Sequence, residues 1–558
     1  MSEPTLLQDA YECRRRALAQ VDSASFSWFH LRTVVVAGVG FFTDSYDIFA
    51  INLAVSMLGV VYWQGASHGP GKIPSSSDTA IKVATSGGTV IGQLFFGWLA
   101  DRIGRRRMYG IELMVIILSV LAQALASDSR AISITGLLVF WRVVMGLGIG
   151  GDYPLSSVIT AEFATTKWRG AMMGAVFAMQ GFGQFAAAVV ALIVTAGFKE
   201  SLQNAKDVAH CTGVCQLAVD KMWRVVIGFG AVPACFALYY RLTIPETPRF
   251  TFDVAHDLVK ADEDVRAYLK GLSEESLDLV QRPNHMRNIE FQPKATWSDF
   301  WRHYSQWKHG KVLLGTAASW FFLDVAFYGL GLNNSVILAA IGWTGGKNVY
   351  EIFYRNAVGN LILICAGAIP GYWVTVATVD TLGRKTIQLV GFAVLTILFV
   401  AIGFGYDNLK HTHHGLLALY VVAQFFFNFG PNATTFIVPG ECFPTRYRST
   451  CHGISAASGK VGAIIAQCVF GPLVHRGAKK PDESPWLNHV MQIFSLFMLC
   501  GFFTTWLIPE TKRQTLEALS GESDHPSARY SVASDDTKHD AVAAITSTTP
   551  TAMTSTTV

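Results

Sequence analysis

The stretch GWLADRIGRRR at 97–107 decides the fold, because part of it returns as DTLGRK at 380–385, where Asp380 corresponds to Asp101. Other matches keep the same or nearly the same separation in the chain: Glu162 with Glu441, Arg169 with Arg448, and FFTD at 41–44 with FFLD at 321–324. Several matches in one register are far stronger than any one alone. They indicate two related halves in parallel order, an arrangement that places a substrate site of a transporter between the halves.

Long apolar runs surround these motifs. Of the 558 residues, 51% are hydrophobic and only 15% are charged, whereas soluble proteins carry about 25% charged residues. A membrane-spanning helix needs about 20 apolar residues, and twelve such runs lie near 33–61, 82–101, 109–127, 133–158, 169–197, 222–243, 311–338, 354–378, 387–405, 415–438, 450–474 and 488–508. We therefore expect an all-α membrane protein with twelve transmembrane helices in two pseudo-symmetric six-helix halves. The net charge of +4 is too small to indicate a nucleic-acid partner.

The polar interruptions divide the chain. We expect a cytoplasmic N-terminus at 1–32, six-helix halves at 33–245 and 311–510, a cytoplasmic central loop at 246–310, and a disordered cytoplasmic tail at 511–558, rich in Ser and Thr. Basic residues favour the cytoplasmic side of short loops, and most of them fall on the side of both termini. Arg476, Lys479 and Lys480 are exceptions to this orientation.

The first motif resembles the loop signature of the major facilitator superfamily. GGDYPLSSVITAEFATTKWRG at 150–170 resembles the signature of its phosphate:proton symporter family, especially the fungal high-affinity branch. The likeness extends over nearly the whole membrane region. It implies a multi-pass plasma-membrane protein that is not an enzyme and needs no cofactor. It also implies proton-coupled symport of inorganic phosphate into the cell by alternating access.

The resemblance also implies a binding site at Tyr153, Gln180, Trp320, Asp324, Tyr328, Asn432 and Lys460. The residues support parts of it independently. Trp320, Asp324 and Tyr328 are spaced by four and share one helical stripe. Tyr153 and Asn432 are equivalent positions of the two halves, so the repeat predicts that they face each other. Lys460 could instead extend toward an interface, and Arg142 could either stabilise a buried acid or anchor its helix at the membrane surface.

Four carboxyl groups within the apolar runs are candidates for proton coupling: Asp44, Asp47, Asp152 and Asp324. Intramembrane acids are costly and usually functional. Asp44 and Asp47 lie three residues apart on one helix face, where neighbouring acids favour proton binding. A protonated Asp324 could donate to phosphate, whereas an ionised one would repel it. The alternative is that each acid lies at a helix end, pairs with an arginine or is packed as a neutral group.

A cytoplasmic gate is predicted at Asp101, Glu162, Arg169, Asp380, Glu441 and Arg448, because these charges recur at one membrane face in both halves. Alternatively, they only determine topology. His411, His413 and His414 could bind a metal, and Cys211 and Cys215 could bind one or oxidise, but we expect neither, and no metal site. The sequence leaves two other functions open: transport of organic phosphates such as glycerophosphodiesters, and phosphate sensing with little transport. Proteins that bind the central loop or tail are possible regulatory partners.

Overall fold

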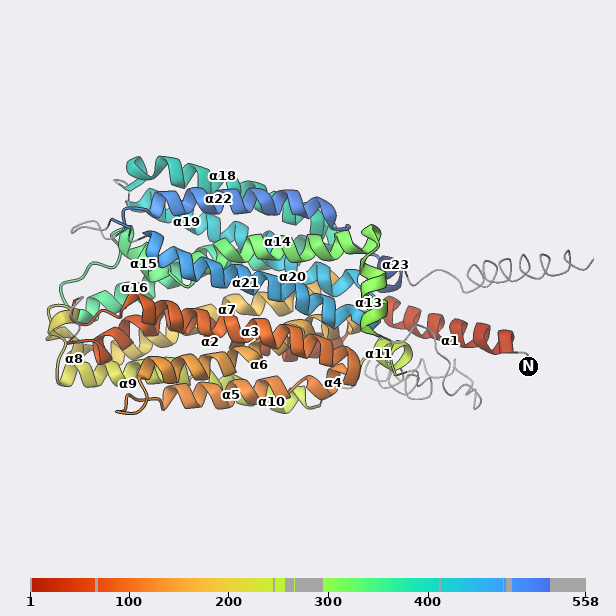
Figure 1. Cartoon of the computed structure of the whole chain (residues 1–558), viewed down its shortest axis with the longest axis horizontal. Coiled ribbons are helices and arrows are strands. Elements are labelled where there is room, and N and C mark those ends of the chain that lie inside the picture. The colour runs from red at the N-terminus through yellow and green to blue at the C-terminus, as the bar shows by residue number, and fades with distance from the viewer. Residues whose placement is uncertain are drawn as a thin grey trace, which may run out of the picture.

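The computed structural model describes residues 3–65, 69–243, 246–255, 265, 295–410, 413–474, 476–477 and 484–521 (Figure 1). Within these ranges every regular element is a helix. In the described part of the chain, eleven helices are long and apolar enough to cross a membrane. The helix α3 (Ser75–Ile103), 29 residues long and packed inside the same bundle, is the twelfth. The predicted all-α fold with twelve spans is confirmed.

The first six spans run from α2 to α10. Their bounds are α2 (Trp28–Tyr62), α3, α4 (Arg105–Met108) leading into α5 (Ile111–Ala124), α6 (Ile134–Phe163), α7 (Arg169–Gly197), and α9 (Val214–Gly228) followed by α10 (Ala231–Arg241). Ser133 caps α6 by accepting from the backbone N–H of Gly136 at 3.2 Å, which satisfies one of the free donors of a helix N-terminus. The first span begins at Trp28, earlier than the predicted residue 33.

The second six spans repeat this order. They comprise α14 (Trp307–Gly331), α16 (Val349–Leu363) continuing through a π-turn at Ile364–Ala368 into α17 (Ile369–Leu382), α18 (Arg384–Lys410), α19 (His413–Asn428) with α20 (Pro431–Cys442), α21 (Arg448–Val474) and α22 (Leu487–Thr504). The glycines of the repeated motif end corresponding helices, because Gly104 and Gly383 take φ values of 114° and 97°. Such positive φ angles suit glycine.

The most extensive contacts between the two halves involve α3 of the first half and α21 of the second, and α7 of the first half and the span α16–α17 of the second. Small residues permit the close approach: a Cβ added to Gly97 would lie 2.7 Å from the carbonyl oxygen of Ser449. The site between the halves is therefore bounded by these pairs.

Four short or peripheral helices gather at one end of the bundle, the right-hand end in Figure 1. They are α1 (Glu3–Ser23), α11 (Pro248–Asp253), α13 (Trp297–Tyr304) and α23 (Leu516–Ser520). The predicted boundary of a disordered tail at residue 511 is wrong, since the hydroxyl of Thr511 donates to Glu441 at 2.5 Å and α23 packs on α20. Residues 522–558 and most of the central loop, at 256–264 and 266–294, lie outside the described residues.

The expectation that Cys211 and Cys215 stay unoxidised is wrong, because they form a disulfide. Cys215 lies in the first turn of α9, and the two Cα atoms are 5.2 Å apart, within the range that a disulfide spans. Gln64 donates to the carbonyl oxygen of Cys211 at 3.0 Å, so the bridged loop is fastened to the end of α2. His411 and the side chains of His413 and His414 lie outside the described part of the chain.

Candidate functional site

A buried polar cluster lies where helices of both halves meet. Its side chains come from α6, α7, α14, α17, α20 and α21, and all are almost completely buried: Tyr153, Gln180, Trp320, Asp324, Tyr328, Tyr372, Asn432 and Lys460. The structure thus brings together all seven residues of the predicted binding site.

Lys460 is the cation of this cluster. Its Nζ lies 2.9 Å from Oδ2 of Asp324, 4.1 Å from the ring centroid of Tyr328 and 5.1 Å from that of Tyr153. The ring of Trp320 lies 6.4 Å from that of Tyr153. Lys460 therefore points into the bundle and does not extend to an interface, which resolves the alternative left open by the sequence.

A chain of hydrogen bonds joins the two halves beside this pair. The amide of Gln180 donates to the Tyr153 hydroxyl at 2.9 Å, and the Tyr372 hydroxyl donates to Oε1 of Gln180 at 3.4 Å. Asn432 donates to the Tyr372 hydroxyl at 2.9 Å and to Asn428 Oδ1 at 2.7 Å. Tyr153 and Asn432 thus belong to one network, linked through two side chains rather than by direct contact. The donors of this network could be turned toward an oxyanion.

The sequence interpretation missed Tyr372 and Asn428. Asn428 had a detectable signal, since it precedes Asn432 by four residues and so shares its helical face. Tyr372 had a weaker one, because a single hydroxyl in an apolar span is common. The contact of α17 with α7 brings Tyr372 into the network, and the contact of α19 with α20 brings in Asn428.

A second cluster of buried acids lies between α2, α5, α6 and α10. Arg241 donates to Asp152 Oδ2 at 2.6 Å and to Glu112 Oε1 at 2.9 Å. Asp44 lies beside Asp152, and among the described residues neither of its carboxyl oxygens has a donor partner. Asp152 is therefore an arginine-paired acid, whereas Asp44 is unpaired. Arg241 and Glu112 were not predicted, although both stand within apolar runs.

Asp47 faces the junction of α9 and α10, where a Cβ on Gly230 would collide with its carboxylate. Arg142 is buried and donates to the carbonyl oxygen of Ile81 at 2.9 Å, within electrostatic reach of Asp47. Arg142 thus lies in the bundle interior near a buried acid, and does not anchor its helix at the membrane surface. Among the residues that the structure describes, no group of three or more His, Cys, Asp or Glu is placed to hold a metal ion.

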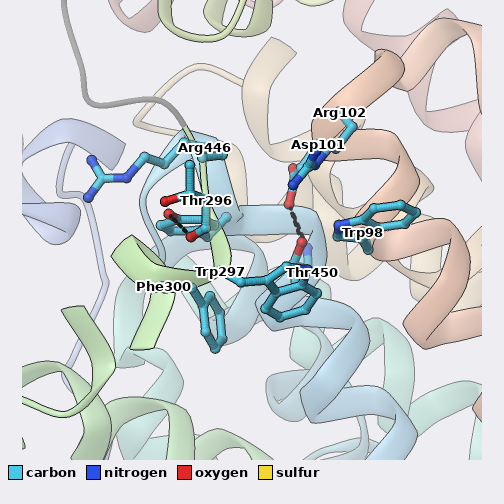
Figure 2. A pocket seen from close by; sticks show the side chains of 10 residues that line it. Trp98, Asp101, Arg102, Thr296, Trp297, Phe300, Arg446 and Thr450 are labelled. Carbon is cyan, nitrogen blue, oxygen red and sulfur yellow. Dashed lines mark hydrogen bonds between the residues drawn. The ribbon is translucent and has the colours of Figure 1, made fainter. Parts of the chain in front are cut away.

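The predicted gate residues meet at the end of the bundle where α1 and α23 lie. Asp101 accepts from the backbone N–H groups of Ser449 and Thr450, at 3.2 and 2.7 Å, at the start of α21. Figure 2 shows Asp101 joined to Thr450 at the edge of a small pocket of about 20 Å³. In the other half, Asp380 accepts from the N–H groups of Gly170 and Ala171, at 3.2 and 2.8 Å, at the start of α7. Each aspartate thus binds the positive end of a helix of the opposite half.

Arginines pair with the predicted gate carboxylates within each half. Arg105 lies 3.2 Å from Asp101 and 3.5 Å from Glu162, and Arg384 lies 2.8 Å from both Asp380 and Glu441. The sequence interpretation treated these arginines only as topology signals. The repeat carried the missing signal, because Arg384 occupies the position in the second half that Arg105 occupies in the first.

The repeat symmetry fails at the remaining arginines. Arg448 reaches across the interface to Glu162 at 2.8 Å. Its counterpart Arg169 instead binds Asp22 at the end of α1, at 2.8 Å, and the carbonyl oxygen of Gln514, at 2.8 Å. From the repeat alone, Arg169 would be expected to bind Glu441, as Arg448 binds Glu162. It binds Asp22 of α1 and Gln514 of the segment 511–521 instead.

The opposite end of the interface is also closed. Lys82 of α3 donates to Asn333, at 2.8 Å, at the end of α14. Asn52 of α2 donates to Asn360 at 3.3 Å and accepts from the Ser335 hydroxyl at 3.1 Å. Contacts between the halves therefore exist on both sides of the central cluster.

Comparison with known proteins places this geometry in a family. Residues 33–522 match the family model described as "Sugar (and other) transporter". The chain is 63% identical over 525 residues to the "Repressible high-affinity phosphate permease" of Neurospora crassa, covering 93% of this chain and 91% of that protein. It is 56% identical over 533 residues to the "Inorganic phosphate transporter PHO84" of Saccharomyces cerevisiae, covering 92% and 88% of the two chains.

Among solved structures, the proton:xylose symporter XylE bound to 6-bromo-6-deoxy-D-glucose has the same fold, with a TM-score of 0.65, 19% sequence identity and coverage of 89% of this chain and 99% of that one. The proteins that these comparisons name are transporters and permeases, not enzymes. The chain therefore belongs to the sugar (and other) transporter family of the major facilitator superfamily, alongside fungal high-affinity phosphate permeases.

Proposed function

We propose that the protein is a proton-coupled symporter that carries inorganic phosphate into the cell across the plasma membrane by alternating access. The similar proteins named as phosphate permeases and transporters support the substrate. The observation that carries the proposal is the buried pair of Asp324 and Lys460 at 2.9 Å, set among hydrogen-bond donors from both halves.

Asp324 couples the proton to the anion through Lys460. While Asp324 is ionised, the ammonium of Lys460 is held by it and its charge is neutralised. A proton on Asp324 removes that partner and leaves a buried cation uncompensated, which is costly. An entering phosphate then restores the charge balance at Lys460. The amides of Gln180 and Asn432 and the hydroxyls of Tyr153 and Tyr372 can exchange their mutual hydrogen bonds for bonds to phosphate oxygens.

The acid cluster supplies a second proton site. Asp152 and Glu112 already share the single guanidinium of Arg241. The neighbouring Asp44 lacks a donor partner among the described residues. A negative charge on it would be repelled by the two carboxylates, and Arg241 is already paired with both of them. We assign Asp44 and Asp152 to the passage of protons from the outside. Asp47 lies on α2, as Asp44 does, but nearer the membrane exterior.

Alternating access follows from the two sets of contacts between halves. The Asp101, Asp380 and Glu162–Arg448 contacts close the side that we assign to the cytoplasm, together with both chain ends. The Lys82 and Asn52 contacts close the exterior. Rocking of one half against the other breaks one set while the other persists.

Uptake of labelled phosphate into liposomes that contain the purified full chain tests the proposal. An inward proton gradient should drive accumulation, and Asp324→Asn should lower it at least tenfold because the amide cannot take up a proton. Asp220→Asn is the matched control, since Asp220 pairs with Arg224 away from both clusters. Gradient-driven accumulation by Asp324→Asn at the level of the unmodified chain would contradict the coupling role.

The same liposomes separate the two other functions. Stronger competition by a glycerophosphodiester than by unlabelled phosphate would indicate an organic phosphate as substrate. Phosphate binding without any flux would indicate a receptor.

A further inference from the structure

An apolar groove runs along the membrane-facing side of the first and sixth spans. It has a volume of about 460 Å³ and is lined by the first turns of α2 and the last turns of α10: Trp28, Leu31, Arg32, Val35, Val36, Val39, Phe236, Ala237 and Tyr240. A water molecule occupies about 30 Å³, so the groove is large enough for a hydrocarbon chain. Its large side chains are open to the surroundings, with Trp28 exposed by 75% and Phe236 by 70%.

The groove is polar at one end only. Arg32 is exposed, and its guanidinium donates to the neutral hydroxyl of Thr243 at 3.2 Å. Among the described residues Arg32 forms no ion pair, in contrast to the buried Arg241 near the end of the facing helix. Val39 lies seven residues further along α2, or about 10 Å along the helix axis. A cation thus stands at the mouth of a groove that is apolar along the rest of its length.

The position along α2 sets the depth of this cation in the membrane. The helix has 35 residues, which correspond to about 50 Å, whereas the hydrocarbon core is about 30 Å thick. The surplus length allows the first turns of α2 to extend into the headgroup region, and Trp28 and Tyr240 at that end are of the residue types that favour a membrane interface. We therefore place Arg32 at headgroup level and Val39 within the hydrocarbon.

We propose that this groove is a binding site for an anionic phospholipid, with the lipid phosphate at Arg32 and an acyl chain along Val35, Val39 and Phe236. A basic pocket between transmembrane helices is suited to an acidic lipid headgroup. With the orientation proposed above, the lipid belongs to the cytoplasmic leaflet. Free phosphate is disfavoured as occupant, because it would leave the apolar length of the groove unfilled.

The site adjoins the proton machinery. The groove floor is formed by Val36 and Ala237, and one turn deeper a Cβ on Gly40 would collide with Arg241 and Asp152. A lipid held in the groove packs against the same two helices that hold the acid cluster.

Native mass spectrometry of the purified full chain, with equal amounts of phosphatidylglycerol and phosphatidylcholine of the same acyl chains, tests the proposal. One cation near a lipid headgroup favours the acidic lipid by about fivefold, so we expect that preference in the unmodified chain. Arg32→Gln should abolish the preference and Arg32→Lys should retain it. Val35→Trp, at an exposed position, should reduce retention of both lipids by filling the groove.

Arg102→Gln is the matched control, because Arg102 lies over the Trp98 ring, 5.3 Å from its centroid, at the same end of the bundle but outside the groove. Its lipid preference should stay unchanged. Thermal unfolding of each variant verifies folding. Equal retention of the two lipids by the unmodified chain, an unaltered preference in Arg32→Gln, or displacement of the lipid by excess inorganic phosphate would each overturn the proposal.

Discussion

The hydroxyl of Tyr372 connects the two halves of the central network, because it donates to Gln180 of α7 and accepts from Asn432 of α20. Buried hydrogen-bond networks stabilise one arrangement only when every member is satisfied. We therefore expect replacement of a single member to affect both the contact between the halves and the set of donors that the proposed site offers to phosphate.

We expect Tyr372→Phe to raise the apparent KM for phosphate about tenfold or more, since a hydrogen bond to a charged group is worth about 1.5–3 kcal/mol. The ring remains, so packing against Phe177 is kept. Initial rates of uptake into liposomes measure the effect, with the lipid-facing Tyr239→Phe as control. An unchanged KM would exclude the Tyr372 hydroxyl from the site.

Glu517 forms an ion pair that fastens α23 to Arg249 of α11. Its carboxylate lies 2.9 Å from Arg249, which also binds Asp22 at 3.0 Å. Burial acts to raise the pKa of Glu517, but Arg249 and Arg14 outweigh burial and lower this pKa to about 2. Because the pKa is lowered on folding, the pair stabilises docking of α23 above the ordinary glutamate pKa of about 4.3 and is lost as the pH falls toward 2.

Hydrogen exchange of residues 511–521 tests this pH dependence. We expect protection to be constant between pH 8 and 5 in the unmodified chain and to decrease only in stronger acid. Glu517→Gln should lower protection throughout the neutral range. Loss of protection between pH 6 and 5 would mean that another group controls docking.

Helix ends supply the contacts at the proposed inner gate. Asp101 and Asp380 each accept two backbone N–H groups at the start of α21 and α7. A carboxylate there both satisfies free donors and interacts with the helix dipole. Since each aspartate and its helix belong to different halves, the proposed mechanism predicts that the cap forms only when that side of the transporter is closed.

We expect Asp380→Ala to shift the protein toward the inward-open state about fivefold, because loss of an N-terminal cap costs about 0.5–2 kcal/mol. Asp380→Asn should shift it less, as the amide oxygen still accepts. Distances between spin labels on the gate ends of α7 and α17 measure the population. Lys82→Met should shift the balance in the opposite direction by removing the contact with Asn333; a shift in the same direction would refute separate gates.

The helix α1 and the segment 511–521 both brace the interface between the halves. Asp22 of α1 binds Arg169 and Arg249, and Arg14 binds Asp253 of α11 through two hydrogen bonds at 2.6 and 2.8 Å. The segment 511–521 contributes Thr511, Gln514 and Glu517 to the same assembly. The inner closure is therefore built from residues widely separated in the sequence.

A pair of truncations separates this brace from the rest of the tail. A chain that ends at residue 521 should transport phosphate at an unchanged rate per molecule in liposomes, which leaves residues 522–558 for trafficking or turnover. A chain that ends at residue 510 should transport more slowly and unfold at a lower temperature, because it lacks the three contacts. Equal activity of both would show that the segment 511–521 has no part in the transport cycle.

The twelve-span, two-half fold and the helix that carries most of the chemical groups could be predicted from the sequence alone. Hydrophobic runs long enough to cross a bilayer are a local property, and the constant register of the repeat relates Asp101 to Asp380 without any coordinates. The seven predicted binding residues lie in one cluster because helical spacing and the repeat register already place them at the same depth. Their part in phosphate binding, like that of the acids in proton coupling, stays a prediction.

The partner of each group, in contrast, depends on how the helices pack and could not be predicted from the sequence. Asp152 pairs with Arg241, Arg169 turns to Asp22, and Tyr372 joins the central network. These contacts connect residues on different helices, and neither apolar periodicity nor a repeat register specifies which faces of two helices meet. The disulfide and the docking of α23 were missed for the same reason: a short polar segment has no periodic pattern, and its conformation is determined by the surface on which it packs.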